Sequence, residues 1–113
     1  MKWYKGVAEA LQNGKFFNQG NFVVVTDHSE NSGGYVSKVY YYGSNVFTYK
    51  LNPLANKPDN ETFEYDFCGY EGHSRTTKLI CCCLEAVGAK YRVKTFKGKV
   101  VETPVTEKTA KYN

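Results

Sequence analysis

The chain has 113 residues, a formal charge of +4 at pH 7 and a hydrophobic content of 42%. This length supports one core and is too short for two, and no apolar run approaches the roughly 20 residues of a membrane-spanning helix. The charge suits an acidic partner, but nucleic-acid-binding domains are usually more basic. Charged residues interrupt residues 1–10, where a signal peptide would have an apolar core. We therefore expect a soluble, cytoplasmic protein that contacts no membrane, with a single domain over residues 1–105 and a loose tail over residues 106–113.

The chain begins with a pattern that predicts a short helix. Between Lys2 and Asn13 apolar residues recur at helical spacing, and Asn13-Gly14 is a typical helix stop. Gly6 weakens this pattern because glycine is a poor helix former. The apolar positions of the helix are Trp3, Val7, Ala10 and Leu11.

Strand patterns follow this helix. Residues 15–18 predict a short edge strand and residues 19–21 a turn. Residues 22–26 predict a strand that is apolar on both faces, as expected in a covered or central position. The polar, glycine-rich residues 27–34 predict a loop.

Residues 35–51 predict a β-hairpin at the middle of the sheet. A three-residue loop at residues 43–45, with Asn45 in the left-handed conformation, places Val39 opposite Tyr49. We prefer it to a two-residue loop at Ser44-Asn45, which would mix polar and apolar side chains on both faces. One face then carries Val39, Tyr41, Phe47, Tyr49 and Leu51. The other carries Lys38, Tyr40, Tyr42, Val46, Thr48 and Lys50.

That register makes Lys38 and Lys50 direct neighbours, a like-charge pair that costs roughly a few tenths of a kcal/mol. Residues 62–67 alternate between aromatic and acidic side chains, which predicts a further strand. Antiparallel pairing with the hairpin would bring Glu64 and Asp66 onto the surface that carries the two lysines. We interpret these carboxylates as partners in surface ion pairs rather than as a catalytic pair.

The second half of the chain predicts one main helix over residues 75–87, with Ser74 as its N-cap and Gly88 at its end. One stripe of this helix should lie across the apolar face of the sheet. The stripe consists of Thr76, Leu79, Ile80, Cys83, Leu84 and Val87.

Residues 90–104 predict a final hairpin that turns at residues 97–98 and ends at Pro104. Together these elements predict an α+β fold. We expect an antiparallel meander sheet of about five to seven strands, with the helix 75–87 packed on one face and a short N-terminal helix.

The four cysteines, Cys68 and the run 81–83, lack the spacing of a disulfide scaffold. Side chains of consecutive helical residues point about 100° apart, so the run cannot bind one metal ion. We interpret Cys83, together with Cys81 or Cys82, as a small buried hydrophobe. The alternative is a zinc or thiol site in which Cys68 and His73 meet a helix cysteine and His28. No second closely spaced pair completes that pattern, so we expect no metal, no cofactor and no catalytic residue.

The remaining candidate site is basic and aromatic. Alternate positions of the final hairpin are basic, and two more cations lie at the start of the main helix. Two outward tyrosines of the central hairpin can stack on bases or anchor a protein interface. The simpler interpretation is a solvated edge protected from aggregation. The candidate partner surface consists of Lys38, Tyr40, Tyr42, Lys50, Arg75, Lys78, Lys90, Arg92 and Lys94.

One resemblance concerns the main helix and the strand after it. The stretch Gly72-His-Ser-Arg-Thr-Thr-Lys-Leu-Ile80 opens a helix that ends at Val87-Gly88 and runs into Tyr91-Arg-Val-Lys-Thr-Phe96. It resembles small bacteriophage-encoded proteins of uncharacterised function, in which a Ser/Thr-Arg-Thr-Thr-Lys/Arg stretch starts a helix after several strands. The resemblance covers about a quarter of the chain and departs at Cys81-Cys82-Cys83, where such proteins tend to carry polar residues. It transfers no catalytic residue.

The resemblance implies a viral origin, and small non-enzymatic viral proteins often block a host defence complex, as anti-CRISPR proteins do. We therefore expect a binding protein that inhibits a host protein or ribonucleoprotein complex through its Tyr/Lys sheet face or its last hairpin. The alternative is a small nucleic-acid-binding module that uses the same surfaces. A third hypothesis is a zinc- or thiol-dependent enzyme.

Overall fold

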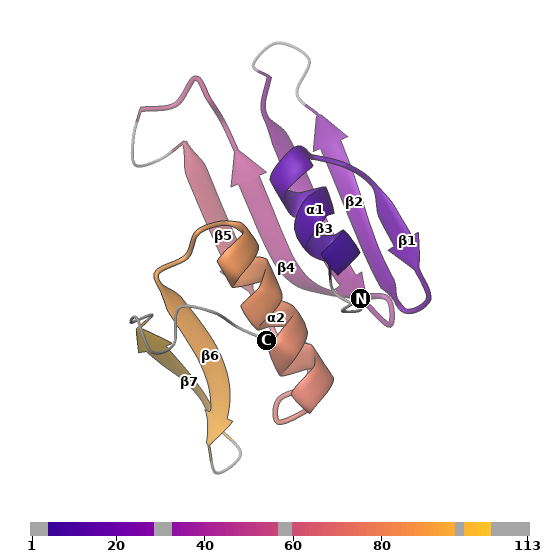
Figure 1. Cartoon of the computed structure of the whole chain (residues 1–113), viewed down its shortest axis with the longest axis vertical. Coiled ribbons are helices and arrows are strands. Elements are labelled where there is room, and N and C mark those ends of the chain that lie inside the picture. Colours follow the sequence, from indigo (N-terminus) through magenta and orange to yellow (C-terminus); the bar gives the residue numbers. More distant parts are fainter. Residues whose placement is uncertain (1–4, 29–32, 57–59, 97–98, 105–113) are drawn as a thin grey trace.

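The computed structural model describes residues 5–28, 33–56, 60–96 and 99–104 (Figure 1). The predicted turn at residues 97–98, the predicted tail and Trp3 lie outside these residues. In chain order the elements are α1 (Lys5–Asn13), β1 (Phe17–Gln19), β2 (Phe22–His28), β3 (Tyr35–Tyr41), β4 (Ser44–Leu51), β5 (Glu61–Tyr65), α2 (Ser74–Ala86), β6 (Tyr91–Phe96) and β7 (Lys99–Pro104). They confirm the predicted α+β fold, with one short N-terminal helix and one main helix.

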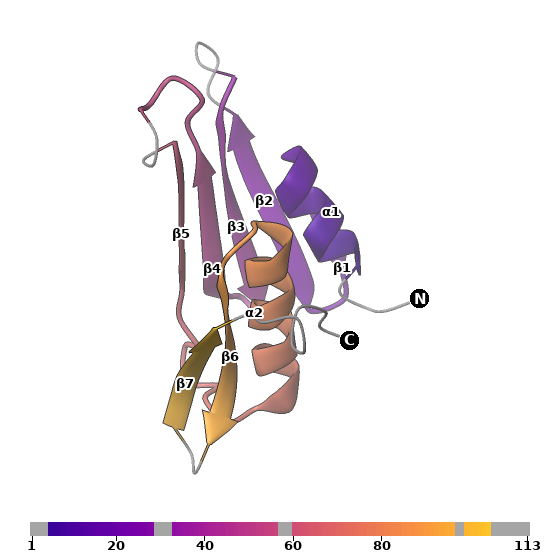
Figure 2. The same ribbon diagram turned by 60° about the vertical axis from the view of Figure 1, so that its left-hand side comes forward.

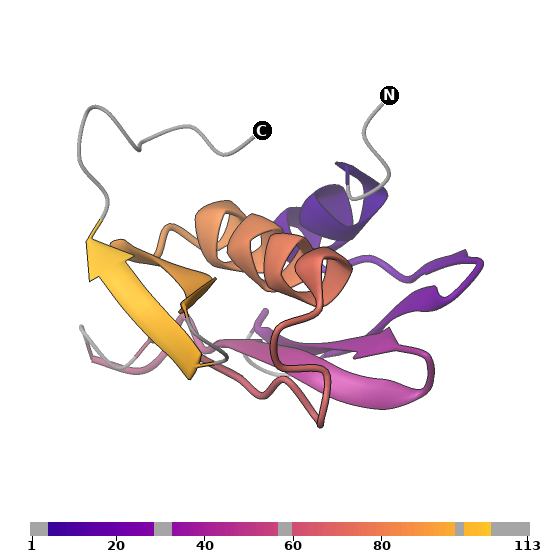
Figure 3. The same cartoon turned by 90° about the horizontal axis from the view of Figure 1, so that it is seen from below.

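The strands form two antiparallel sheets. β1 to β5 make a five-stranded meander in chain order, and β6 and β7 pair only with each other. Both helices lie on the same side of the larger sheet, as seen in Figure 2 and Figure 3. The β6–β7 hairpin lies beside α2, and the Tyr91 ring of β6 approaches the Phe63 ring of β5 with centroids 6.2 Å apart. In the described part of the chain, no helix covers the opposite side of the sheet.

The core lies between this sheet and the two helices. Apolar side chains at the predicted spacing of α1 are buried, namely Val7, Ala10 and Leu11. From the sheet, Val24, Val39, Phe47 and Tyr49 point into the same layer. Together they form one continuous cluster with α2, which buries the apolar surface that drives folding. Neither helix of the described residues has the length and apolar character to cross a bilayer.

Close packing explains the glycine inside α1. A Cβ atom at Gly6 would overlap the Phe17 ring of β1, so only glycine lets the helix lie this close to the edge strand. The helix ends as predicted, with Gly14 at φ +62°. The Tyr35 hydroxyl donates to the carbonyl oxygen of Leu11 at 2.8 Å and so ties the last turn to β3.

The register of the central hairpin differs from the prediction. Tyr42 and Gly43 form a two-residue turn with φ values of +52° and +79°, and Tyr41 pairs with Ser44. A β-bulge then shifts the pairing, so that Val39 lies opposite Phe47 instead of Tyr49. The predicted three-residue loop is therefore wrong.

Asn45 stabilises this bulge with its side chain. Its Nδ2 donates to the carbonyl oxygens of Val39 at 3.1 Å and Phe47 at 3.0 Å. Two successive residues of β4 can then face the core, and Val46, which we placed on the outer face, is only 1% exposed. The remaining core face is as predicted, because the register error is two residues and side chains alternate with a period of two.

The corrected register separates the two lysines. Lys38 pairs with Thr48 and Lys50 with Val36, so the predicted like-charge pair does not form. Pairing of β5 with β4 is confirmed, and Glu64 lies opposite Thr48 in the same row as Lys38. The carboxylate of Asp66, beyond the end of β5, instead accepts a bond from the Cys68 N–H at 2.8 Å.

β2 has a central position between β1 and β3, one of the two positions that its apolar pattern predicts. It is covered on one face only, because Phe22 and Val24 are buried while Val25 is 45% exposed. One further expectation needs correction. The N-cap of α2 is His73 rather than Ser74, and no side-chain hydrogen bond caps the helix there. The predicted helix end is confirmed, since Gly88 at φ +77° follows the C-cap residue.

All three cysteines of α2 are buried, as are most positions of the predicted stripe. The sheet, α1 and β6 surround this helix, so its sides as well as its sheet-facing stripe are covered. This confirms the interpretation of these cysteines as small buried hydrophobes. The final hairpin is also confirmed, with β7 ending at Pro104.

Candidate functional site

The structure divides the predicted partner surface among three places. Lys38, Tyr40 and Lys50 lie on the side of the five-stranded sheet that faces away from the helices. Tyr42 lies in the β3–β4 turn, and Arg75 and Lys78 lie in the first half of α2. The row Lys90, Arg92 and Lys94 belongs to β6 and the residue before it. These residues therefore do not form one basic surface.

The uncovered side of the sheet, which we call the open face, has an apolar centre on β2 and β3. Val23 pairs with Tyr40, and both are half-buried, while the exposed Val25 pairs with Lys38. Val36 continues the apolar centre along β3. Lys38 lies within this group, between Val36 and Tyr40 on β3 and opposite Val25. Polar and charged residues of β4 and β5 border the group on one side, and they are Thr48, Lys50, Thr62 and Glu64. An apolar centre with a polar rim is the usual anatomy of a protein interface.

Tyr42 lies at one end of the sheet as part of an aromatic row. Its ring is 58% exposed and meets the Tyr41 ring edge-on, with centroids 4.6 Å apart. Tyr41 in turn contacts Tyr70 and His73 at the start of α2. Burial raises the pKa of Tyr41, while the nearby Arg75 lowers it. This row fixes the turn against the helix and leaves one face of Tyr42 accessible.

The basic row of β6 is only partly free. Lys90 and Lys94 are exposed, whereas Arg92 is half-buried beside Cys81. Burial raises the pKa of Cys81, and the backbone of Val93 and the positive charge of Arg92 oppose that rise. Arg92 thus takes part in the packing of β6 on α2 in addition to any surface role.

The cysteines show no sign of nucleophilic chemistry. Burial raises the pKa of Cys82 to about 12 and also raises the pKa of Cys83. Cys68 is half-buried, and its thiol donates to the Asn45 carbonyl oxygen at 2.9 Å. Thiols with raised pKa values stay protonated at neutral pH, and the thiolate is the reactive form. Among the described residues, no three His, Cys, Asp or Glu side chains are grouped so as to hold a metal ion.

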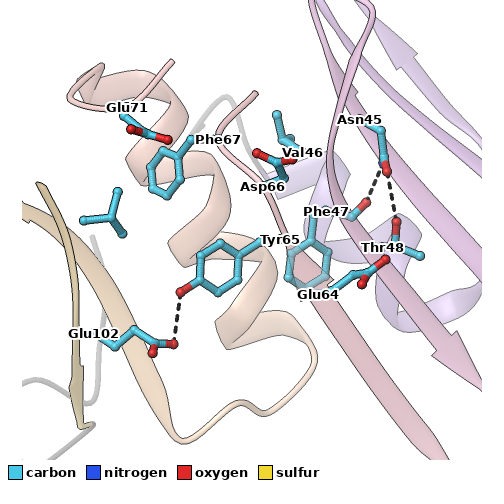
Figure 4. Close-up of a pocket in the computed structure, with 11 residues that line it drawn as sticks. Asn45, Val46, Phe47, Thr48, Glu64, Tyr65, Asp66, Phe67, Glu71 and Glu102 are labelled. Atoms are coloured by element: carbon cyan, nitrogen blue, oxygen red, sulfur yellow. Dashed lines mark hydrogen bonds between the residues drawn. The ribbon is translucent and has the colours of Figure 1, made fainter. Parts of the chain in front are cut away.

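The sequence did not predict a groove of about 630 Å³ beside β5, shown in Figure 4. It is lined by residues 45–48 of β4, by the end of β5 and the turn after it, and by β7. The aromatic rings of Tyr65 and Phe67 lie between these segments. Its charged lining residues are all acidic, and they are Glu64, Asp66, Glu71 and Glu102.

One hydrogen bond crosses this acidic groove. The Tyr65 hydroxyl donates to Oε2 of Glu102 at 3.0 Å and so connects β5 to β7. The pKa of Tyr65 is raised mainly by burial and, to a smaller extent, by this bond to a carboxylate. The alternation of Glu64 and Asp66 was visible in the sequence. Glu71 and Glu102 could not be added to them, because only the packing of the last hairpin brings these segments together.

Comparison of the chain with protein-family models, with curated proteins and with solved structures gave no match. The geometry of the open face and of the acidic groove is therefore the basis for assigning a function.

Proposed function

We propose that this chain is a non-catalytic binding protein that acts through the open face of its sheet. The observation that carries this proposal is the position of both helices on one side of the sheet, which leaves Val25 exposed beside Tyr40 and Val36. In keeping with its resemblance to phage-encoded proteins, the partner is a protein of a bacterial defence complex, and binding inhibits that complex. Tyr40 supplies the aromatic anchor, because tyrosine is enriched among the residues that dominate interface energy.

The distribution of charge favours a protein partner over nucleic acid. The open face carries Glu64 and Asp27 as well as Lys38 and Lys50, so its field is mixed in sign. A phosphate backbone requires a surface of positive sign, and its affinity comes mainly from such contacts. A mixed rim around an apolar centre instead gives specificity for one protein surface.

The test is affinity capture from bacterial lysate, quantified by mass spectrometry, with wild-type, Val25→Glu and Lys94→Glu chains. Val25 pairs with Lys38, so a glutamate there gains an opposite charge across the strands and preserves the fold. It also places a charge in the apolar centre. We expect Val25→Glu to recover at least about tenfold less of one bacterial protein, the loss typical of an interface anchor.

Lys94→Glu is the control because it places the same side chain at an exposed position of β6 and changes the net charge by more. We expect it to recover the partner as well as the wild type does. Equal recovery by all three chains would contradict the proposal. Loss with Lys94→Glu alone would move the interface to the last hairpin.

Inhibition is tested separately from binding. Bacteria with an active CRISPR system are supplied with the wild-type chain or with Val25→Glu and infected with a targeted phage. We expect the wild type to raise the plating efficiency of the phage and the variant to leave it low. Capture of a partner without any change in plating would keep the binding function and reject the inhibitory one.

Lys90, just before β6, and Lys94 within it are exposed at alternate positions of one row with Arg92 between them, which favours nucleic-acid binding as the second candidate function. Affinity carried by phosphate contacts falls steeply between about 50 and 200 mM salt. A gel shift with single- and double-stranded nucleic acid at both salt concentrations tests this function. Absence of any retention at the lower concentration would reject it.

A further inference from the structure

β5 is the last strand of the five-stranded sheet, and its outer edge is the one that faces away from β4. Among the described residues β5 pairs only with β4, so its other edge carries no strand. Hydrogen bonds from the Asn52 N–H to the Asn60 oxygen and from the Asp66 N–H to the Val46 oxygen flank the pairing of these strands. In an antiparallel pair the direction of the backbone groups alternates, so the even-numbered residues face β4. The N–H and C=O groups of Phe63 and Tyr65 therefore point away from β4.

This edge runs into the acidic groove. Tyr65, Phe67 and Val100 are the aromatic and apolar residues at the outer part of the groove, and Phe67 is buried beneath it. Carboxylates surround these residues, and none of the groove's described lining residues is a lysine or arginine. The chain as a whole has a charge of +4, so this acidity is local to the groove. A strand edge offers backbone hydrogen bonds, and the carboxylates select the charge of what binds there.

We propose that the groove binds an extended, lysine- or arginine-rich segment of a protein partner, which adds to the sheet as a strand beside β5. Its backbone pairs with the outward groups of Phe63 and Tyr65. Its cationic side chains reach Glu64, Asp66 and Glu71, while an apolar residue between them lies on the other side of the strand, against the Tyr65 ring. The groove shares Thr48 and Glu64 with the rim of the open face. The inference does not rest on the proposed function, because it is centred on the outer edge of β5 and not on Val25 and Tyr40.

Pairing with a second copy of β5 fits the charges less well. The segment Glu61–Asp66 holds three carboxylates and no cation. Two such strands side by side would bring six carboxylates together, and like charges across strands destabilise a sheet. Nucleic acid is disfavoured for the same reason, because phosphates and carboxylates repel. A basic peptide is the occupant that removes the repulsion among the groove's own carboxylates.

The experiment uses a fluorescent peptide of about eight residues, the usual length of a strand, in which lysine alternates with valine. A second peptide has glutamate at every lysine position. We expect the lysine peptide to bind by fluorescence anisotropy and the glutamate peptide not to bind. On saturation with the lysine peptide, amide hydrogen exchange of Phe63 and Tyr65 should slow at least about tenfold.

The Glu64→Gln and Glu71→Gln double variant tests the charge contribution. Both side chains are exposed, and the exchange keeps their size, so the fold is expected to persist. Loss of two exposed ion pairs should weaken peptide binding about fivefold at low salt. The control is Val25→Glu on the open face, which should bind the peptide as the wild type does even if it loses the partner of that face.

Three results would overturn the inference. They are absence of binding, binding without protection of the two amides, and equal binding of the two peptides. Protection of Phe63 and Tyr65 in the free protein, together with a dimer in sedimentation, would assign the edge to a second copy instead.

Discussion

The two faces of the five-stranded sheet are built from the same strands but meet different surroundings. On the covered face Val24, Val39 and Phe47 are at most 1% exposed and contact the helices. On the open face their direct sequence neighbours Val25 and Lys38 are exposed, and Tyr40 is half-buried. Because strand side chains alternate, one residue of displacement along the chain separates a core position from a surface position.

Because of this difference, we expect the covered face to determine stability and the open face to determine binding. Residues of the covered face have helices as partners and account for much of the apolar burial. Residues of the open face have no such partner among the described residues, so an apolar side chain there gains little from folding. An apolar centre that folding does not require is better explained by a partner, and substitutions on the two faces should therefore change different measurements.

The largest effect is expected for Phe47→Ala. The Phe47 ring is 1% exposed and stacks with Phe63 at 6.1 Å, so its removal leaves a cavity. We expect a loss of about 3–5 kcal/mol in the free energy of unfolding, measured by urea denaturation. The control is Lys50→Ala, exposed on the open face of the same strand, with an expected change within about 0.5 kcal/mol. Similar losses for both variants would show that the two faces are not distinct.

The second effect concerns the end of the β3–β4 pair that lies away from its turn. A Cβ atom at Gly34 would overlap the carbonyl oxygen of Leu51, and a backbone atom cannot move aside as a side chain can. We expect Gly34→Ala to destabilise by about 1–3 kcal/mol, as overpacking usually does. Gly33→Ala meets no neighbouring atom and has only its φ of +71° as a source of strain. A larger loss at Gly33 than at Gly34 would contradict this packing.

Periodicity predicted the elements well because it depends on local chemistry. The spacing of Val7 and Leu11 gave α1, and the alternation of Phe63 and Tyr65 gave β5, since each pattern reports which side of its own element is buried. The class of fold followed from the order of these elements. The same reasoning correctly assigned the cysteines of α2 to the core.

The features that the sequence did not predict depend on side-chain contacts between different elements. The hairpin register is set by the Asn45 side chain bridging a bulge, and by a tyrosine at φ +52°, a conformation uncommon for non-glycine residues. The acidic groove needs Glu71 and Glu102 to approach the end of β5. Gly6 weakens the helical pattern in the sequence, and only the structure shows that the Phe17 ring occupies the space that a Cβ atom would need there.

The third prediction concerns pH and the covered core. Burial raises the pKa of Cys82 from 9.0 to about 12, so above pH 9 the unfolded chain releases this proton more readily than the folded chain. The unfolded state then binds fewer protons, and stability falls with rising pH between these two values. Relative to Cys82→Ala, the wild type should lose about 1.4 kcal/mol per pH unit there. Parallel urea-denaturation curves of stability against pH for the two proteins would reject this.

A smaller effect is expected for Asn45→Ala, which removes both donors that bridge the bulge. Both of these half-buried hydrogen bonds are lost, together with the one that the Thr48 hydroxyl donates to Asn45 Oδ1, and we expect a destabilisation of about 1 kcal/mol. Asn18→Ala, at an exposed position of β1, is the control and should change stability little. The amide exchange of Phe47 should also accelerate in Asn45→Ala. Unchanged exchange together with unchanged stability would mean that the bulge does not need this side chain.

The smallest effect is expected for Val25→Ala, and Val24→Ala gives its sharpest comparison, because the two valines are adjacent positions on opposite faces. Val24→Ala should lose about 2 kcal/mol through the cavity that it leaves, whereas Val25→Ala, 45% exposed, should change the free energy of unfolding by less than about 0.5 kcal/mol. Both values come from urea denaturation of the isolated chain at two protein concentrations.

If Val25→Ala lost as much free energy of unfolding as Val24→Ala, something in the free protein would already cover the open face. If the stability lost in Val25→Ala grew with protein concentration, a second copy of the chain would be what covers the open face. In either case the open face would not be free for a partner, and the proposed function would need another surface.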